Sequence, residues 1–189
     1  MKDFIRLLRF IYPLCAVLFI GSVFTGAYLQ DRETSNSNSF TAATWTPSPT
    51  PTPANVIINE VLSNGSEWIE LYYSAGALSL ADYTIEDNTS IPKDLSAYSI
   101  PAGGYLVLTQ GVDFSFILNN PGDILTLKKS GSTVDKMSYG NYNDGNILDN
   151  APVPSVGESV ARIPNGTDTN NDIADFQILT TPTAGSSNG

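Results

Sequence analysis

The chain of 189 residues contains no histidine, a single cysteine and few charged side chains. Without histidine, any catalysis that relies on an imidazole is excluded. A lone cysteine cannot form a disulfide within the chain, and no zinc site of cysteine and histidine ligands can exist. Serine, threonine, asparagine, glycine and proline are frequent, and this composition is typical of short strands joined by many turns.

Charge is distributed unevenly along the chain. The formal net charge is −10, and from Asn55 onward sixteen acids stand against five bases, which are Lys93, Lys128, Lys129, Lys136 and Arg162. A surface this acidic repels phosphate backbones at long range, so we expect no non-specific binding to nucleic acid. Acidity is compatible with cation binding, but a solvated acidic surface is the simpler interpretation.

The N-terminus has the pattern of a membrane segment. Three bases lie before residue 10, and twenty uncharged residues follow at 10–29. A helix of that length spans about 30 Å, the thickness of the hydrocarbon layer. The bases precede the apolar run, so the positive-inside rule places the N-terminus in the cytoplasm and everything after residue 30 outside.

Residues 1–30 are therefore predicted to be a transmembrane anchor or a signal segment. The unbroken length of the apolar run favours an uncleaved anchor. Thr25-Gly26-Ala27 offers small residues for a signal peptidase, which would release a secreted form. Cys15 lies in mid-run without the small preceding residue of a lipobox, and we interpret it as a membrane-buried side chain.

Residues 31–54 are predicted to be a disordered linker rich in serine, threonine and proline. Its second half, at 46–54, alternates proline with serine or threonine, which favours an extended polyproline geometry and excludes a helix. At roughly 3 Å per residue, such a spacer holds a domain up to about 70 Å from the bilayer.

From Asn55 to residue 189 the sequence pattern is typical of an all-β domain. Turn residues separate short β-prone runs, and this spacing is typical of a β-sandwich or barrel. Ser130-Gly131 supplies a tight hairpin turn, and 142–155 is predicted to be a long surface loop. The predicted strands are 55–61, 67–73, 78–87, 104–110, 114–118, 123–129, 132–139, 158–163 and 175–179.

Alternation predicts which side chains form the core. Ile69 and Leu71 share one face of their strand, whereas Glu70 lies on the other face. Together with Leu106 and Leu108 of a later strand, Ile69 and Leu71 are predicted to be mostly buried.

Glu60 is the less expected carboxylate, because simple alternation places it on the same face as Val56, Ile58 and Leu62. A carboxylate that meets the core needs a partner, and Arg162 is the candidate. Glu60 and Glu70 could be an acid/base pair, half of a metal site, or structural residues. The β-prone runs contain no G-x-S-x-G elbow, phosphate loop or metal-spaced acidic triad, so we favour the structural role.

Several short motifs follow one another in a defined order from Asn59 onward. They are Asn59-Glu60, Trp68-Ile69-Glu70-Leu71, Pro101-Ala102-Gly103-Gly104-Tyr105, Gly122-Asp123, Arg162-Ile163-Pro164-Asn165-Gly166 and Thr181-Pro182-Thr183-Ala184-Gly185. This ordered set resembles a known family, the lamin-tail domain as it occurs in prokaryotic surface proteins. The resemblance covers about 55–188 and implies an immunoglobulin-like β-sandwich that serves as an interaction module without catalytic residues. Tyr73 departs from the family pattern, where asparagine is usual, and Ala81-Asp82-Tyr83 stands where Gly-Trp is usual.

One segment has a partial calcium-loop pattern. Asp168, Asn170 and Asp172 fall at positions 1, 3 and 5 of such a loop. Ile173 and Leu179 stand where the loop requires glycine and a bidentate glutamate. Asparagine and aspartate also form turns without a metal, because they bond their own backbone. We favour the plain turn and assign no metal ligand, cofactor or catalytic residue.

The sequence therefore predicts a membrane-anchored, extracytoplasmic lamin-tail protein that is not an enzyme. It would act as a binding, adhesion or scaffolding module at the cell envelope, with an envelope protein or polysaccharide as partner and the membrane contacted through 10–29. The alternatives are a secreted form of the same module and a non-catalytic subunit of an extracellular enzyme.

Overall fold

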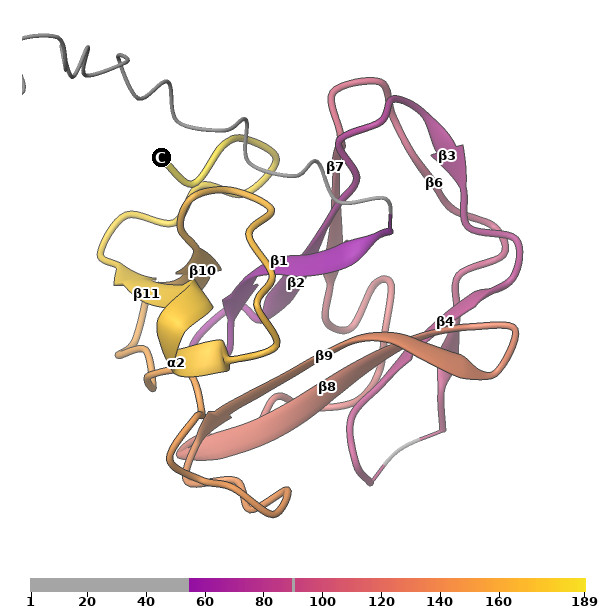
Figure 1. Cartoon of the computed structure of the whole chain (residues 1–189). Coiled ribbons are helices and arrows are strands. Elements are labelled where there is room, and N and C mark those ends of the chain that lie inside the picture. Colours follow the sequence, from indigo (N-terminus) through magenta and orange to yellow (C-terminus); the bar gives the residue numbers. More distant parts are fainter. Residues whose placement is uncertain (1–54, 90) are drawn as a thin grey trace, which may run out of the picture. The chain divides into compact units, whose positions relative to one another are not determined.

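The chain folds into antiparallel β-strands with one short helix in the computed structural model, which describes residues 55–89 and 91–189 (Figure 1). The predicted membrane segment at 10–29 and the predicted linker at 31–54 lie outside these described residues. No described helix is both long and apolar enough to cross a membrane. The elements are β1 (Ile57–Leu62), β2 (Trp68–Tyr72), β3 (Leu78–Ser79), β4 (Tyr83–Glu86), β5 (Lys93–Asp94), β6 (Ser99–Ile100), β7 (Tyr105–Thr109), β8 (Gly122–Lys129), β9 (Ser132–Gly140), β10 (Ser159–Arg162), α2 (Asp172–Asp175) and β11 (Phe176–Leu179).

Two larger sheets and a small ribbon make up the fold. The five-stranded sheet has the order β11-β10-β1-β2-β7, the four-stranded sheet has the order β5-β4-β8-β9, and β3 pairs with β6. A single core cluster contains Ile69 and Leu71 from the first sheet and Leu125 and Leu127 from the second. This architecture is consistent with the immunoglobulin-like sandwich that the sequence predicts. The described residues fall within one compact unit, Pro47–Gly189, which contains its own complete core.

Most of the predicted strands are present, and the hairpin is confirmed. Lys129 pairs with Ser132 across a turn in which Ser130 and Gly131 both have positive φ angles, 48° and 78°. The loop at 142–155 contains no strand; Ala151 makes only an isolated bridge to Tyr139. The sequence missed the two-residue strands β5 and β6, which are too short to show any alternation.

The predicted strand at 114–118 is wrong. Phe114, Phe116 and Leu118 are buried alternately, as in a strand, but only Phe114 makes an isolated bridge, to Gln110. Because the segment finds no neighbouring strand along its length, it inserts these side chains into the core without joining a sheet.

The core prediction holds for Ile69, Leu71 and Leu108, which are all fully buried. Leu106 is only partly buried, although it packs against the same core. The difference follows from its position, because β7 is the edge of the five-stranded sheet.

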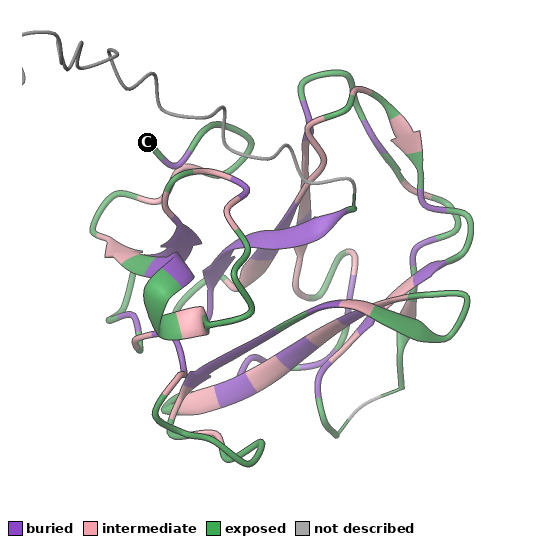
Figure 2. Cartoon of the chain, viewed as in Figure 1, coloured by how far each residue is buried: buried purple, intermediate pink, exposed green. Residues whose placement is uncertain are grey.

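The strand β1 is buried along its whole length (Figure 2). Its pairing with β2 shifts register between Ile58 and Glu60, which marks a bulge at Asn59. Ile58 pairs with the core residue Leu71, whereas Glu60 pairs with Glu70 on the outer face of the sheet. The expectation that Glu60 shares a face with Ile58 is therefore wrong, because the extra residue reverses the alternation after it.

Candidate functional site

Glu60 and Glu70 lie opposite one another on β1 and β2, and both side chains are fully buried. The last residues of the chain lie over them. Thr183 donates its N–H and its hydroxyl to the two oxygens of Glu60, at 2.9 and 2.7 Å. The N–H of Gly185 donates to Glu70 Oε2 at 2.6 Å. The two carboxylates therefore hold the segment around 183–185 against the outer face of the five-stranded sheet.

The bulge residue Asn59 completes this anchorage. Its Nδ2 donates to Glu70 Oε1 at 2.8 Å and to Asn165 Oδ1 at 2.9 Å. The amide of Asn188 in turn donates to the backbone carbonyls of Asn59 and Arg162, at 3.1 and 3.2 Å. The structural role of Asn59 was not evident from the sequence, because two of its partners, Asn165 and Asn188, lie more than a hundred positions away.

Burial raises the pKa of Glu70 to about 7, and the neighbouring charge of Glu60 acts in the same direction. The donors Asn59 and Gly185 oppose this shift by stabilising the charged form. A raised carboxyl pKa is often a mark of an active site. Here each oxygen of Glu70 already accepts a bond from the protein, and the side chain has no exposed surface for a substrate.

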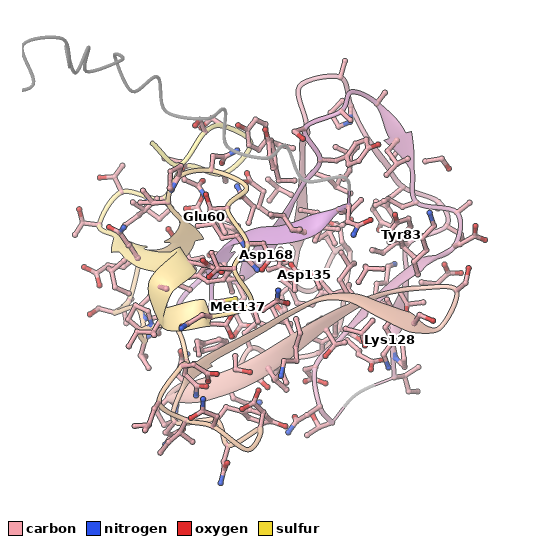
Figure 3. All side chains as sticks on the ribbon, in the orientation of Figure 1. Glu60, Tyr83, Lys128, Asp135, Met137 and Asp168 are labelled. Carbon is pink, nitrogen blue, oxygen red and sulfur yellow. The ribbon has the colours of Figure 1, made fainter. Side chains whose placement is uncertain are left out.

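Arg162 does not bond Glu60, so the predicted pair is wrong. Its guanidinium lies on the core side of the sheet and donates to Asp135 Oδ1 at 3.1 Å, Asp175 Oδ2 at 3.0 Å and Asp168 Oδ1 at 3.3 Å. In Figure 3 the labels of Asp135 and Asp168 lie near one another beside β1, apart from that of Glu60. Arg162 follows Ala161, the register partner of Glu60, and successive residues of a strand point to opposite faces, so Arg162 and Glu60 lie on opposite sides of the sheet.

The Arg162 cluster, which we define as Arg162, Asp135, Asp168 and Asp175, connects the two sheets. Arg162 Nε donates to the carbonyl of Ile58 at 2.9 Å, and Asp135 Oδ2 accepts the Ile58 N–H at 2.6 Å. Both backbone groups of Ile58, beside the bulge, are thus satisfied by an ion pair that reaches from β9 to β10. Burial raises the pKa of Asp135 to about 6, although the guanidinium acts to lower it.

A cavity of about 300 Å³ opens beside this cluster, and most of its charged lining residues are acids, with Lys136 as the base. Its carboxylates serve the protein itself. Asp144 accepts from Lys136 Nζ at 2.6 Å and from the Ser138 hydroxyl at 3.1 Å. Asp172 accepts the Ser138 N–H at 2.7 Å, and burial raises its pKa to about 6.

Asp168, Asn170 and Asp172 do not converge on a common point. Asp168 Oδ1 bonds Arg162 and accepts the N–H of Asn170 at 3.1 Å, which is the local bond of an aspartate turn. Asp172 faces the edge of β9 instead. No group of three acidic or cysteine side chains in the described part of the chain is arranged to hold a metal ion.

A family model described as Lamin Tail Domain matches residues 49–141. The chain contains a lamin tail domain. Lamin tail domains are non-enzymatic immunoglobulin-like domains, in agreement with the antiparallel sheets. The match ends before β10, α2 and β11, so the resemblance at 158–185 rests on its motifs alone. No curated protein and no solved structure matches the chain.

The last five residues of this lamin tail domain, GSSNG at 185–189, fit the letters of a nucleophile elbow. An elbow needs a strand before the serine, a helix after it and a base beside it. Here the segment forms neither element, and the chain has no histidine. Asn188 and Gly185 are instead part of the anchorage on the outer face.

Proposed function

We propose that this lamin tail domain is a non-catalytic binding, adhesion or scaffolding module that acts at the outer surface of the cell envelope. The observation that carries the proposal is the engagement of its buried carboxylates. Glu60 and Glu70 hold the 183–185 segment, and Asp135 and Asp175 hold Arg162. Groups that would be available for catalysis in an enzyme are used here to hold the fold together.

The cellular placement in this proposal is supported by the sequence pattern. The uncharged run at 10–29 follows three bases, and the proline-rich segment at 46–54 separates it from the domain. We propose that the first is a single-pass anchor and the second an extended spacer. The alternative is cleavage near Thr25-Gly26-Ala27, which would release the same module as a secreted protein.

Fractionation of cells that express the full chain tests the placement. We expect the intact chain in the membrane fraction, with its N-terminal peptide detected by mass spectrometry, and cleavage of the domain by protease added to whole cells. A new N-terminus near Tyr28 together with protein in the medium would favour the secreted form. Protection from external protease in intact cells, with lysis restoring cleavage, would contradict both forms.

Co-sedimentation tests the binding role. Purified residues 47–189 are mixed with cell envelopes of the source organism at low and at high salt. We expect binding that survives high salt, because a specific contact between surfaces depends less on screened charge than a diffuse attraction does. Extraction of the envelopes with protease, and separately with glycan hydrolases, then distinguishes a protein partner from a polysaccharide. Absence of binding at both salt concentrations would contradict the proposal.

A further inference from the structure

The edge strand β7 leaves part of its backbone without a partner. At the two ends of its pairing with β2, Tyr73 N donates to Gly104 O and Gln110 N donates to Glu67 O. Gly104 and Gln110 therefore bond the neighbouring strand. In an antiparallel pair only alternate residues bond the neighbour, so Tyr105 and Val107 turn their N–H and C=O groups away from β2.

No described residue bonds these outward groups. Thr109, the next outward residue, is already engaged, because its N–H donates to Asp113 Oδ2 at 2.8 Å and its carbonyl accepts the Asp113 N–H at 2.7 Å. Tyr105 and Val107 have no such turn beside them. Because unpaired backbone groups are costly away from water, those of Tyr105 and Val107 must face solvent, another chain or a part of this chain outside the described residues.

The long edge of the four-stranded sheet, β9, is closed by carboxylates. On β9 the outward N–H of Ser138 donates to Asp172, and that of Lys136 donates to Asp135 Oδ1 at 2.8 Å. The edge strand β5 is only two residues long. In contrast, β7 has five residues, YLVLT, without a charge, a proline or a register shift. It lacks the features with which proteins usually protect an edge from strand addition.

Charge at this edge favours one kind of partner. Three of the four lysines of the described residues lie on β8 and β9, in the other sheet; the fourth, Lys93 on β5, lines a cavity together with the acids Asp94 and Asp113. The five-stranded sheet contains one base, Arg162, and it is buried. The half-buried acids Glu67 and Asp113 lie at the Thr109 end of β7. A second copy of this chain would bring acids against acids, whereas a cationic segment would be attracted.

We propose that the β7 edge binds an extended, basic segment of another protein by adding it to the sheet as a strand. The register sets the pattern of that segment. The residue opposite Leu106 faces the core side and is apolar. The residues opposite Tyr105 and Val107 lie on the outer face and are basic, beside the Tyr72–Tyr105 ring pair with centroids 5.0 Å apart. This inference rests on the proposed binding role and names its surface.

Isotope-labelled residues 47–189 allow the edge to be tested with synthetic peptides by NMR titration and amide hydrogen exchange. The probe is acetyl-KVKVKVK-amide, which has the required alternation. One control peptide is acetyl-EVEVEVE-amide, which reverses the charge. The other is the basic probe N-methylated at alternate residues, which removes the backbone N–H donors along one edge of the peptide. We expect the basic probe alone to shift residues 103–109, to slow exchange at Tyr105 and Val107, and to weaken with salt.

Two proline variants identify the edge. Val107→Pro removes one outward donor and leaves the bonds of β7 to β2 intact, so it should weaken the probe about tenfold. Ile178→Pro is the control, because Ile178 is the corresponding outward residue on β11, and it should leave probe binding unchanged. Circular dichroism checks that both variants are folded.

Four results would overturn the inference. The first is the absence of shifts at 103–109, and the second is equal binding of the acidic peptide. The third is a dimer of the protein alone, seen by sedimentation, in which Tyr105 and Val107 are already protected from exchange. The fourth is envelope binding that persists in Val107→Pro, which leaves the proposed binding role standing. Loss of envelope binding in that variant, with the Ile178→Pro control unaffected, would support both.

Discussion

Replacement of Arg162 by methionine should cost more than any surface substitution in this domain. Methionine keeps most of the side-chain length but removes the donors to Asp135, Asp168 and Asp175 and to the carbonyls of Ile58 and Thr167. The arginine side chain and those of Asp135 and Asp175 are almost fully buried. Breaking a buried pair by removal of one partner typically costs on the order of 3–5 kcal/mol, and we expect a loss in that range.

The loss should depend on pH in a defined direction. Burial already raises the pKa of Asp135 to about 6, and Arg162 opposes this rise. Without the guanidinium the pKa rises further, so the folded state binds this proton more tightly than the unfolded state does. A carboxyl of this kind destabilises the fold as pH rises above its unfolded value, so the cost of Arg162→Met should be larger near pH 7 than near pH 5.

Urea denaturation of residues 47–189 at these two pH values measures both effects. Lys128→Met is the matched control, because Lys128 forms a partly exposed ion pair with Glu86 and should cost less than about 1 kcal/mol. A loss below about 1 kcal/mol for Arg162→Met, or a loss that is equal at the two pH values, would refute the reasoning that the cluster stabilises the junction of the sheets.

Three further predictions concern the core, the outer face and one turn. Leu71→Ala should cost on the order of 2–5 kcal/mol in denaturant melts, and a loss below about 1 kcal/mol would mean that the core face is misassigned. Because the folded pKa of Glu70 is about 7 against 4.5 for the free group, stability should fall as pH rises between these values, and Glu70→Gln should remove that decrease; an unchanged pH profile would contradict this. Gly140→Ala should destabilise strongly, because its Cβ would lie 1.9 Å from the carbonyl oxygen of Pro121. Gly76→Ala, also at positive φ but without a neighbour within 4 Å, should show only the backbone strain of roughly 1–3 kcal/mol, and equal losses would exclude the clash.

The alternation of apolar and polar residues correctly predicted those strands that have one buried face. In β8 the buried residues Asp123, Leu125 and Leu127 alternate with half-buried ones, and its boundaries agree with the sequence within one residue. The same rule failed in β1, because both of its faces are covered and the bulge at Asn59 changes the phase. It also failed at 114–118, where the side chains alternate but no second strand is available to pair.

The partners of the charged residues could not be read from the sequence. Arg162 and Asp135 are 27 positions apart, and Thr183 and Glu60 are 123 positions apart. Only the order of the strands brings these groups together. The sequence did predict that Glu70 lies on the face opposite Leu71, but it contained no sign that a distant segment covers that face.

The order β11-β10-β1-β2-β7 has a consequence for the time course of folding. The strand β1 is the first of the domain to leave the ribosome, yet its partner β10 follows about a hundred residues later, as the pair Glu60 and Ala161 shows. At roughly 5–20 residues per second, synthesis leaves one side of β1 unpaired for about 5–20 seconds. The central strand is therefore made first but stays unpaired on one side until β10 has been synthesised, and the domain cannot form its native sheet before then.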